Sequence, residues 1–166
     1  YFTFHDIDEN KPAGSINIRV ETITYALKQY QNRLRERLKP IPIEELIEKF
    51  VNAANVARQT GFDGVQIHAA HGYLNSQFLS GLSNDRDDQW GGSLANRARF
   101  LLEIVRRTRQ ALPNPFAVTV KLNSADFQKG GFSEEDSVTV AGWLQEAGCD
   151  MIEVSGGNYE QPRMID

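Results

Sequence analysis

The sequence feature that most constrains the fold is an alternation, repeated three times, between a helical pattern and a short apolar run. The predicted helices span residues 43–60, 93–112 and 133–147. The predicted strands span residues 62–68, 116–122 and 149–154. Helices alternating with short strands are typical of parallel βα units, so the sequence predicts an α/β fold.

Helix-capping residues and a weak internal repeat support this interpretation. Gly61 ends the first helix, Ser93 caps the second, and the third opens on residues 133–136, a capping box with Asp in place of Glu. A Gly-x-Asp triplet precedes two of the strands, at residues 61–63 and 148–150. These patterns fit a closed barrel and an open doubly wound sheet equally. A dinucleotide-binding fold is disfavoured, because no Gly-x-Gly-x-x-Gly motif follows a strand.

Charge and cysteine content narrow the function classes. The 166 residues include 18 Lys and Arg against 22 Asp and Glu, a net charge of −4, which disfavours nucleic acid and anionic membranes as partners. No apolar run approaches the length of a membrane span, and we expect a cytoplasmic protein. The single cysteine, Cys149, excludes a disulfide framework or a multi-cysteine metal site within this chain. No basic residue flanks it, which favours a buried, inert thiol.

Residues 1–40 form an atypical N-terminal segment, and residues 41–166 carry the βα pattern. Residues 14–22 alternate like a strand, but the run from Val20 to Leu38 lacks Gly and Pro and favours a helix. Its cluster of basic residues fits a solvated face better than an anion-binding arm.

The most informative motif is His68-x-x-His71, with Tyr73 two residues further on. It falls where the first strand ends, and the carboxyl ends of parallel strands build the active site in βα barrels. Residues three apart on a strand face opposite sides, so the chain must turn after His68 for the imidazoles to converge. Converging imidazoles can bind a carbonyl oxygen or a small anion, and the Tyr73 phenol can deliver a proton. A loop-stabilising role for the pair and a zinc site are the alternatives, although the motif supplies only two zinc ligands.

Three further positions have two interpretations each. Lys121 interrupts an apolar strand, where it either meets a negative group inside the fold or reaches solvent. Residues 155–157, Ser-Gly-Gly, form a phosphate-binding turn or a plain turn. The polar loop 84–93 and the pair Asn96-Arg97 favour structural roles.

Four ordered strings together resemble the old yellow enzyme family of FMN-dependent NAD(P)H:flavin oxidoreductases. They occupy residues 61–74, 84–97, 120–127 and 155–157, within a resemblance that runs from about Ile43 to Tyr159. The likeness is closest to the bacterial-type branch that includes xenobiotic reductases and 2,4-dienoyl-CoA reductase relatives. Asp88-Gln-Trp90 replaces the more usual Asp-Glu-Tyr of this family.

The resemblance implies a (β/α)₈ TIM barrel that binds FMN at its C-terminal mouth. In this family NAD(P)H reduces the flavin, which passes hydride to the β-carbon of an α,β-unsaturated carbonyl compound. His68 and His71 match the pair that binds the substrate carbonyl, and Tyr73 matches the tyrosine that protonates the α-carbon. Lys121 matches the basic residue near flavin N1, and His68 also borders the cofactor. The resemblance implies a small-molecule substrate and leaves an oligomer possible.

The resemblance covers about three central βα units, from the fourth to the sixth strand. Because a complete barrel typically needs about 250 residues, we expect a partial barrel that is active only within a longer chain. The family's phosphate-binding residues, and the iron–sulfur cysteines of the dienoyl-CoA reductase branch, would follow residue 166. Two alternatives stay open. One is a truncated, non-catalytic relative that acts by interaction, and the other is a His-x-x-His metal hydrolase.

Overall fold

The computed structural model describes residues 41–158, which form four helices and three strands in the predicted alternation. The elements are α2 (Ile43–Gln59), β1 (Gly64–Ala69), α3 (Leu74–Leu79), α4 (Leu94–Ala111), β2 (Ala117–Asn123), α5 (Glu134–Glu146) and β3 (Met151–Ser155). The helix predicted over residues 20–38 and the proposed division at residue 40 depend on residues outside the described range. No helix in the described range has the length and apolar character needed to cross a membrane.

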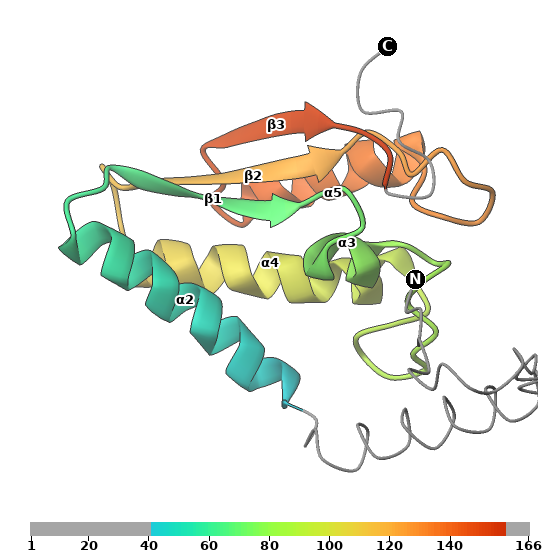
Figure 1. The fold of residues 1–166 in the computed structure, drawn as a ribbon, viewed down its shortest axis with the longest axis horizontal. Helices are drawn as coiled ribbons and strands as arrows, with labels where there is room; N and C mark the ends of the chain where they lie inside the picture. Colours follow the sequence, from blue (N-terminus) through green and yellow to red (C-terminus); the bar gives the residue numbers. More distant parts are fainter. Residues whose placement is uncertain (1–40, 159–166) are drawn as a thin grey trace, which may run out of the picture. The chain divides into compact units, whose positions relative to one another are not determined.

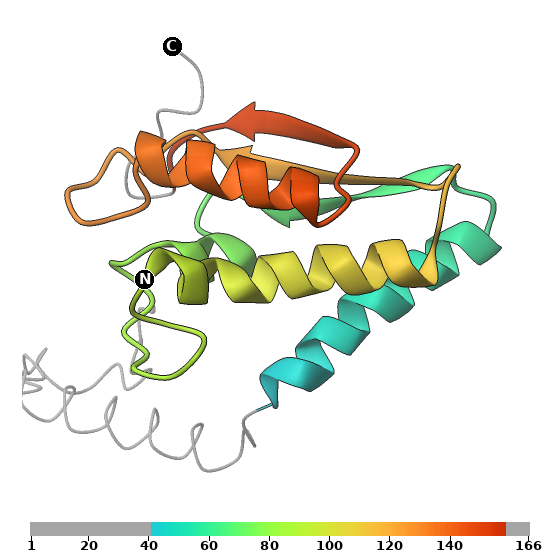
Figure 2. The same ribbon diagram turned by 180° about the vertical axis from the view of Figure 1, so that it is seen from behind.

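The three strands form one parallel sheet in the order β1-β2-β3. The strand arrowheads all point toward the end of the sheet where α3 lies (Figure 1). The helices lie on one side of the sheet, as the view from behind also shows (Figure 2). After β1 the chain returns through α4 to the start of β2, and after β2 it returns through α5 to the start of β3, which is the βα arrangement that the sequence predicts.

Local chemistry explains where the helices begin and end. The Ser93 hydroxyl accepts a hydrogen bond from the Asn96 N–H at 3.3 Å, which caps α4. The predicted capping box of α5 is confirmed, with reciprocal bonds between Ser133 and Asp136. Gly61 and Gly148 follow α2 and α5 with φ of 92° and 93°, a conformation that glycine adopts without strain. The two Gly-x-Asp triplets therefore form equivalent turns.

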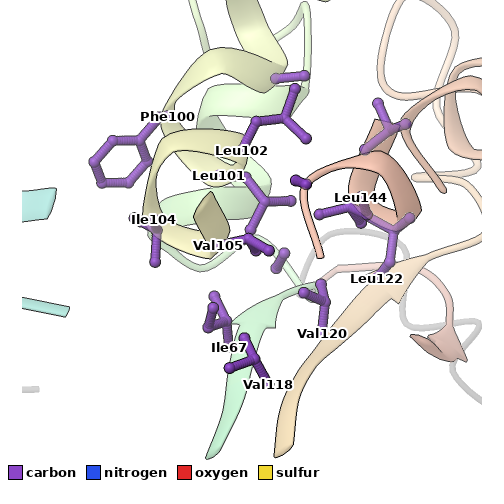
Figure 3. Packing of buried hydrophobic residues seen from close by; sticks show 14 of the residues in the cluster. Ile67, Phe100, Leu101, Leu102, Ile104, Val105, Val118, Val120, Leu122 and Leu144 are labelled. Carbon is purple, nitrogen blue, oxygen red and sulfur yellow. The ribbon is translucent and has the colours of Figure 1, made fainter. Parts of the chain in front are cut away.

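The hydrophobic core lies between the helices and the face of the sheet that they cover. Ile67, Val118 and Val120 project from that face onto Leu101 and Val105 of α4 (Figure 3). These five side chains are at most 5% exposed to solvent. Each fully buried aliphatic side chain contributes about 1.5–3 kcal/mol through the hydrophobic effect, so this layer holds the sheet to α4.

The opposite face of the sheet is polar, and no element of the described range covers it. The strand register places His68, Lys121 and Glu153 side by side in one cross-strand row. Gln66, Thr119 and Met151 form the neighbouring row. Because side chains alternate between the faces of a strand, the residues between the core positions all lie on this second face. We refer to it below as the inner face.

Candidate active site

The candidate site lies where β1 ends and the chain turns toward α3. His68 is on the inner face of β1, and the strand ends one residue later at Ala69. His71 then adopts a left-handed conformation with φ of 61°, and Gly72 follows with φ of 78°. This is the turn that convergence of the two imidazoles requires, and it is confirmed.

The turn brings the three candidate side chains together. The ring centroids of His68 and His71 are 5.2 Å apart with the planes at 89°, and those of His68 and Tyr73 are 4.9 Å apart. Tyr73 is at the N-cap of α3 and is 46% exposed. Two imidazoles and a phenol therefore lie together at the end of β1, and all three are side chains that can donate a hydrogen bond.

Hydrogen bonds from the neighbouring strands fix the position of His71. Its backbone N–H donates to the Asn123 side-chain oxygen at 3.2 Å, and its Nε2 lies 2.6 Å from the Ser155 hydroxyl. Asn123 is 1% exposed and also donates to the Gly157 carbonyl and to the Asp126 carboxylate. One amide thus joins the loops that follow all three strands.

Both imidazoles have pKa values below the usual 6.5. For His68 the causes, in order, are burial and the positive charges of His71 and Lys121. For His71 they are burial and the charge of Lys121. Glu153 opposes these effects in both cases. At neutral pH both rings are therefore uncharged, and each carries one N–H donor.

Lys121 pairs with a negative group, as the first of its two interpretations from the sequence expects. Its Nζ lies 2.8 Å from Glu153 Oε1, and Gln66 donates to the other oxygen of Glu153 at 2.9 Å. The hydrogen bond from Lys121, followed by that from Gln66, lowers the pKa of Glu153, which is a carboxylate at neutral pH. Sequence reasoning missed Glu153. The signal was available, because Glu153 interrupts an apolar strand just as Lys121 does.

The remaining sequence predictions resolve as structural roles. Arg97 donates to the Leu79 and Gly92 carbonyls and to Asp136, so it is the structural clamp that the sequence favours. The Gly157 N–H donates to the Ala125 carbonyl, which favours a plain turn over a phosphate-binding turn at residues 155–157. Burial raises the pKa of the Cys149 thiol, in keeping with an inert side chain.

A cavity of about 300 Å³ lies beside the turn. Its lining includes Gly72 and Asn158, and an isolated β-bridge joins Asn158 to His71. The other lining residues come from α3, the loop that follows it and the loop after β2. They are Ser76, Gln77, Ser80, Leu82, Ser83, Asp126 and Gln128. Within the described range no group of three or more His, Cys, Asp or Glu side chains is placed to hold a metal ion.

Solved structures of known proteins share this fold. A 2-naphthoyl-CoA reductase, solved with 2-naphthoyl-CoA, matches 75% of the chain with a TM-score of 0.71 and 39% identity. The old yellow enzyme homologue from Zymomonas mobilis also matches 75% of the chain, with a TM-score of 0.64 and 29% identity. Old yellow enzyme-type structures are TIM barrels, so the described residues are part of a (β/α)₈ barrel and the inner face is the interior of that barrel.

The sequence comparisons define the family. Residues 9–162 match the NADH:flavin oxidoreductase / NADH oxidase family, and the chain belongs to it. This match begins at residue 9, whereas the resemblance identified from the sequence motifs begins at about Ile43. The NADH oxidase of Thermoanaerobacter brockii is 43% identical over 125 residues, 75% of this chain.

The chain spans 19% of the length of that NADH oxidase and 38% of the Zymomonas mobilis structure. Family members use FMN with NAD(P)H as the reductant.

The donor set of the inner face fits the ring system of FMN. The pyrimidine ring of a flavin gains negative charge on reduction, and a cation at that position stabilises it. Lys121 offers a cation on the inner face, where its side chain is 26% exposed and lies next to His68 in the register. Glu153 already pairs with Lys121, so a bound flavin would share the ammonium group with this carboxylate.

Proposed function

We propose that this chain forms part of an FMN-dependent oxidoreductase that reduces the C=C bond of an α,β-unsaturated carbonyl compound with NAD(P)H. The contact between His68, His71 and Tyr73 at the carboxyl end of β1 carries this proposal. Family membership supports the flavin and the reductant. The names of two structural relatives, 2-naphthoyl-CoA reductase and morphinone reductase, support a small unsaturated substrate. We place the enzyme in the cytoplasm.

His68 and His71 each donate one hydrogen bond to the substrate carbonyl oxygen. Two N–H donors withdraw electron density from the carbonyl, so the conjugated β-carbon becomes a better hydride acceptor. FMN, when bound, would supply the hydride, with NAD(P)H as the reductant. The neutral state of both rings suits this role, because each keeps a donor without placing a second positive charge beside Lys121.

Tyr73 supplies the proton for the α-carbon. Its hydroxyl is a hydrogen-bond donor, and the ring contact with His68 keeps the Tyr73 side chain beside the carbonyl site. Lys121 would hold the ring system of bound FMN through its ammonium group, with Glu153 limiting the net positive charge at that position. The interaction-protein alternative rests on residues 20–38, outside the described range, and we do not develop it.

The test uses the complete gene product, purified and examined for a yellow chromophore. We expect bound FMN, and NAD(P)H oxidation that accelerates when 2-cyclohexenone is added, with the saturated ketone as product. His68→Ala combined with His71→Ala is expected to raise KM for the enone while FMN stays bound. A colourless protein, or NAD(P)H oxidation that ignores the enone, would overturn the proposal.

A further inference from the structure

The two imidazoles are held by different ring nitrogens. The backbone N–H of Ala70 donates to His68 Nδ1 at 3.3 Å, so Nδ1 is the acceptor and the proton of the neutral ring is on Nε2. Asn75 fixes the same residue by donating to the His68 carbonyl at 2.9 Å. His68 therefore offers Nε2–H to a ligand.

His71 is held the other way round. Its Nε2 is 2.6 Å from the Ser155 hydroxyl, and its Nδ1 has no hydrogen-bond partner among residues 41–158. Asn123 is the cross-strand neighbour of Ser155 and accepts the backbone N–H of His71. The end of β2 thus binds the backbone of His71 and the end of β3 binds its ring. This leaves Nδ1 as the ring nitrogen available to a ligand.

A hydroxyl–imidazole contact permits two proton arrangements. If Nε2 carries the proton, Ser155 accepts it and Nδ1 is a bare acceptor that would repel a carbonyl oxygen. If Ser155 donates, Nε2 accepts, the ring proton is on Nδ1, and His71 can bind a carbonyl. Only the second arrangement lets both histidines donate to one oxygen.

We propose that Ser155 is a positioning residue whose hydroxyl donates to His71 Nε2 and so holds His71 as the Nδ1–H tautomer. The role of this tautomer in binding a carbonyl rests on the proposed function. The tautomer itself can be measured without substrate or turnover, so its test does not depend on that function. The site then presents Nε2–H from His68 and Nδ1–H from His71.

Substitutions at Ser155 separate this role from a structural one. Ser155→Ala removes the donor, so His71 loses its preference for Nδ1–H and the Nε2–H form gains population. Ser155→Thr keeps the hydroxyl, and a β-branched side chain suits a strand position. We expect kcat/KM for an enone to fall about tenfold in Ser155→Ala, the effect of one lost hydrogen bond, and to recover in Ser155→Thr.

The direct test is a long-range ¹H–¹⁵N correlation spectrum of the ¹⁵N-histidine-labelled complete gene product at a mildly basic pH, where both imidazoles are neutral. His→Gln variants assign the signals, and this chain contributes only three histidines. We expect the Nδ1–H pattern for His71 in the wild type and in Ser155→Thr, and a larger Nε2–H fraction in Ser155→Ala.

Two results would overturn the inference. One is an Nε2–H pattern for His71 in the wild type, which needs no variant to fold. The other is an identical His71 pattern in the wild type and in Ser155→Ala. Failure of the proposed function has a different signature, namely NAD(P)H oxidation that does not respond to an enone, whatever the tautomer of His71.

Discussion

At the scale of single residues, the proposed function gives Tyr73 a role in one chemical step and in no other. Its hydroxyl is the proposed proton donor, while hydride acceptance depends on His68 and His71. We expect Tyr73→Phe to lower kcat for enone reduction about 10²-fold or more. NAD(P)H oxidation with ferricyanide as electron acceptor needs no proton from this position and should be unchanged. Equal losses in both assays would show that Tyr73 acts on flavin binding or folding instead.

The two histidines also make stability depend on pH. Their pKa values are lowered in the folded protein, whereas an unfolded histidine titrates near 6.5. Below that pH the unfolded chain binds more protons than the folded one, so acid removes stability. We expect a His68→Gln, His71→Gln double variant to lose less stability than the wild type between about pH 7.5 and pH 5.5. Urea unfolding at the two pH values measures this, and parallel losses would contradict it.

The residues of the site could be predicted to different degrees. Spacing alone required a turn after His68, and the left-handed His71 and Gly72 provide it. The Lys121–Glu153 pair was not predicted, because its partners are 32 positions apart and meet only through the register of β2 and β3. The contact between His71 and Ser155 has the same origin. Neither sequence periodicity nor motif spacing contains the register of a sheet.

At the scale of helices and strands, Arg97 joins three helices. Its guanidinium bonds the carbonyl of Leu79 at the end of α3, the carbonyl of Gly92 before α4, and Asp136 of α5. We expect Arg97→Lys to lower the free energy of unfolding by about 1–3 kcal/mol, because lysine cannot reproduce the fork of donors. Arg106→Lys is the matched control on the same helix, since Arg106 is exposed and, among residues 41–158, pairs only with Glu103.

Urea unfolding of the two variants distinguishes a specific clamp from a general effect of charge. The control should change stability by less than about 0.5 kcal/mol, as exposed ion pairs do. Similar effects in both variants would count against the clamp.

Helix and strand positions were the most predictable part of the fold. Each of α2, α4 and α5 combines a periodic apolar face with a capping residue or a terminal glycine, so its bounds follow from local chemistry. The strands are shifted by one or two residues from the predicted runs, since hydrogen bonding to a neighbour determines where a strand begins. Local sequence patterns could not distinguish a closed barrel from an open sheet, and the comparison with the family was needed to do so.

At the scale of the whole molecule, β3 has an apolar outer residue that the described elements leave uncovered. Val154 shares its face with the buried Leu122 but is 68% exposed. We expect Val154→Asp to improve the solubility of residues 41–158 expressed alone. In a longer chain that supplies the next element of the barrel, the same change should cost about 3 kcal/mol or more. The test compares wild type with Val154→Asp by solubility and thermal unfolding, once in residues 41–158 alone and once in the longer chain. Equal effects of the substitution in the two chains would refute the prediction.

The left-handed backbone at His71 limits which substitutions are useful at this position. A φ of 61° excludes β-branched and most bulky residues, while His, Asn and Asp tolerate it. Of those three, only His and Asn carry an N–H donor at neutral pH. His and Asn are therefore the two useful residues at position 71. A mutant library that aims to change substrate scope gains more by varying the residues around this position.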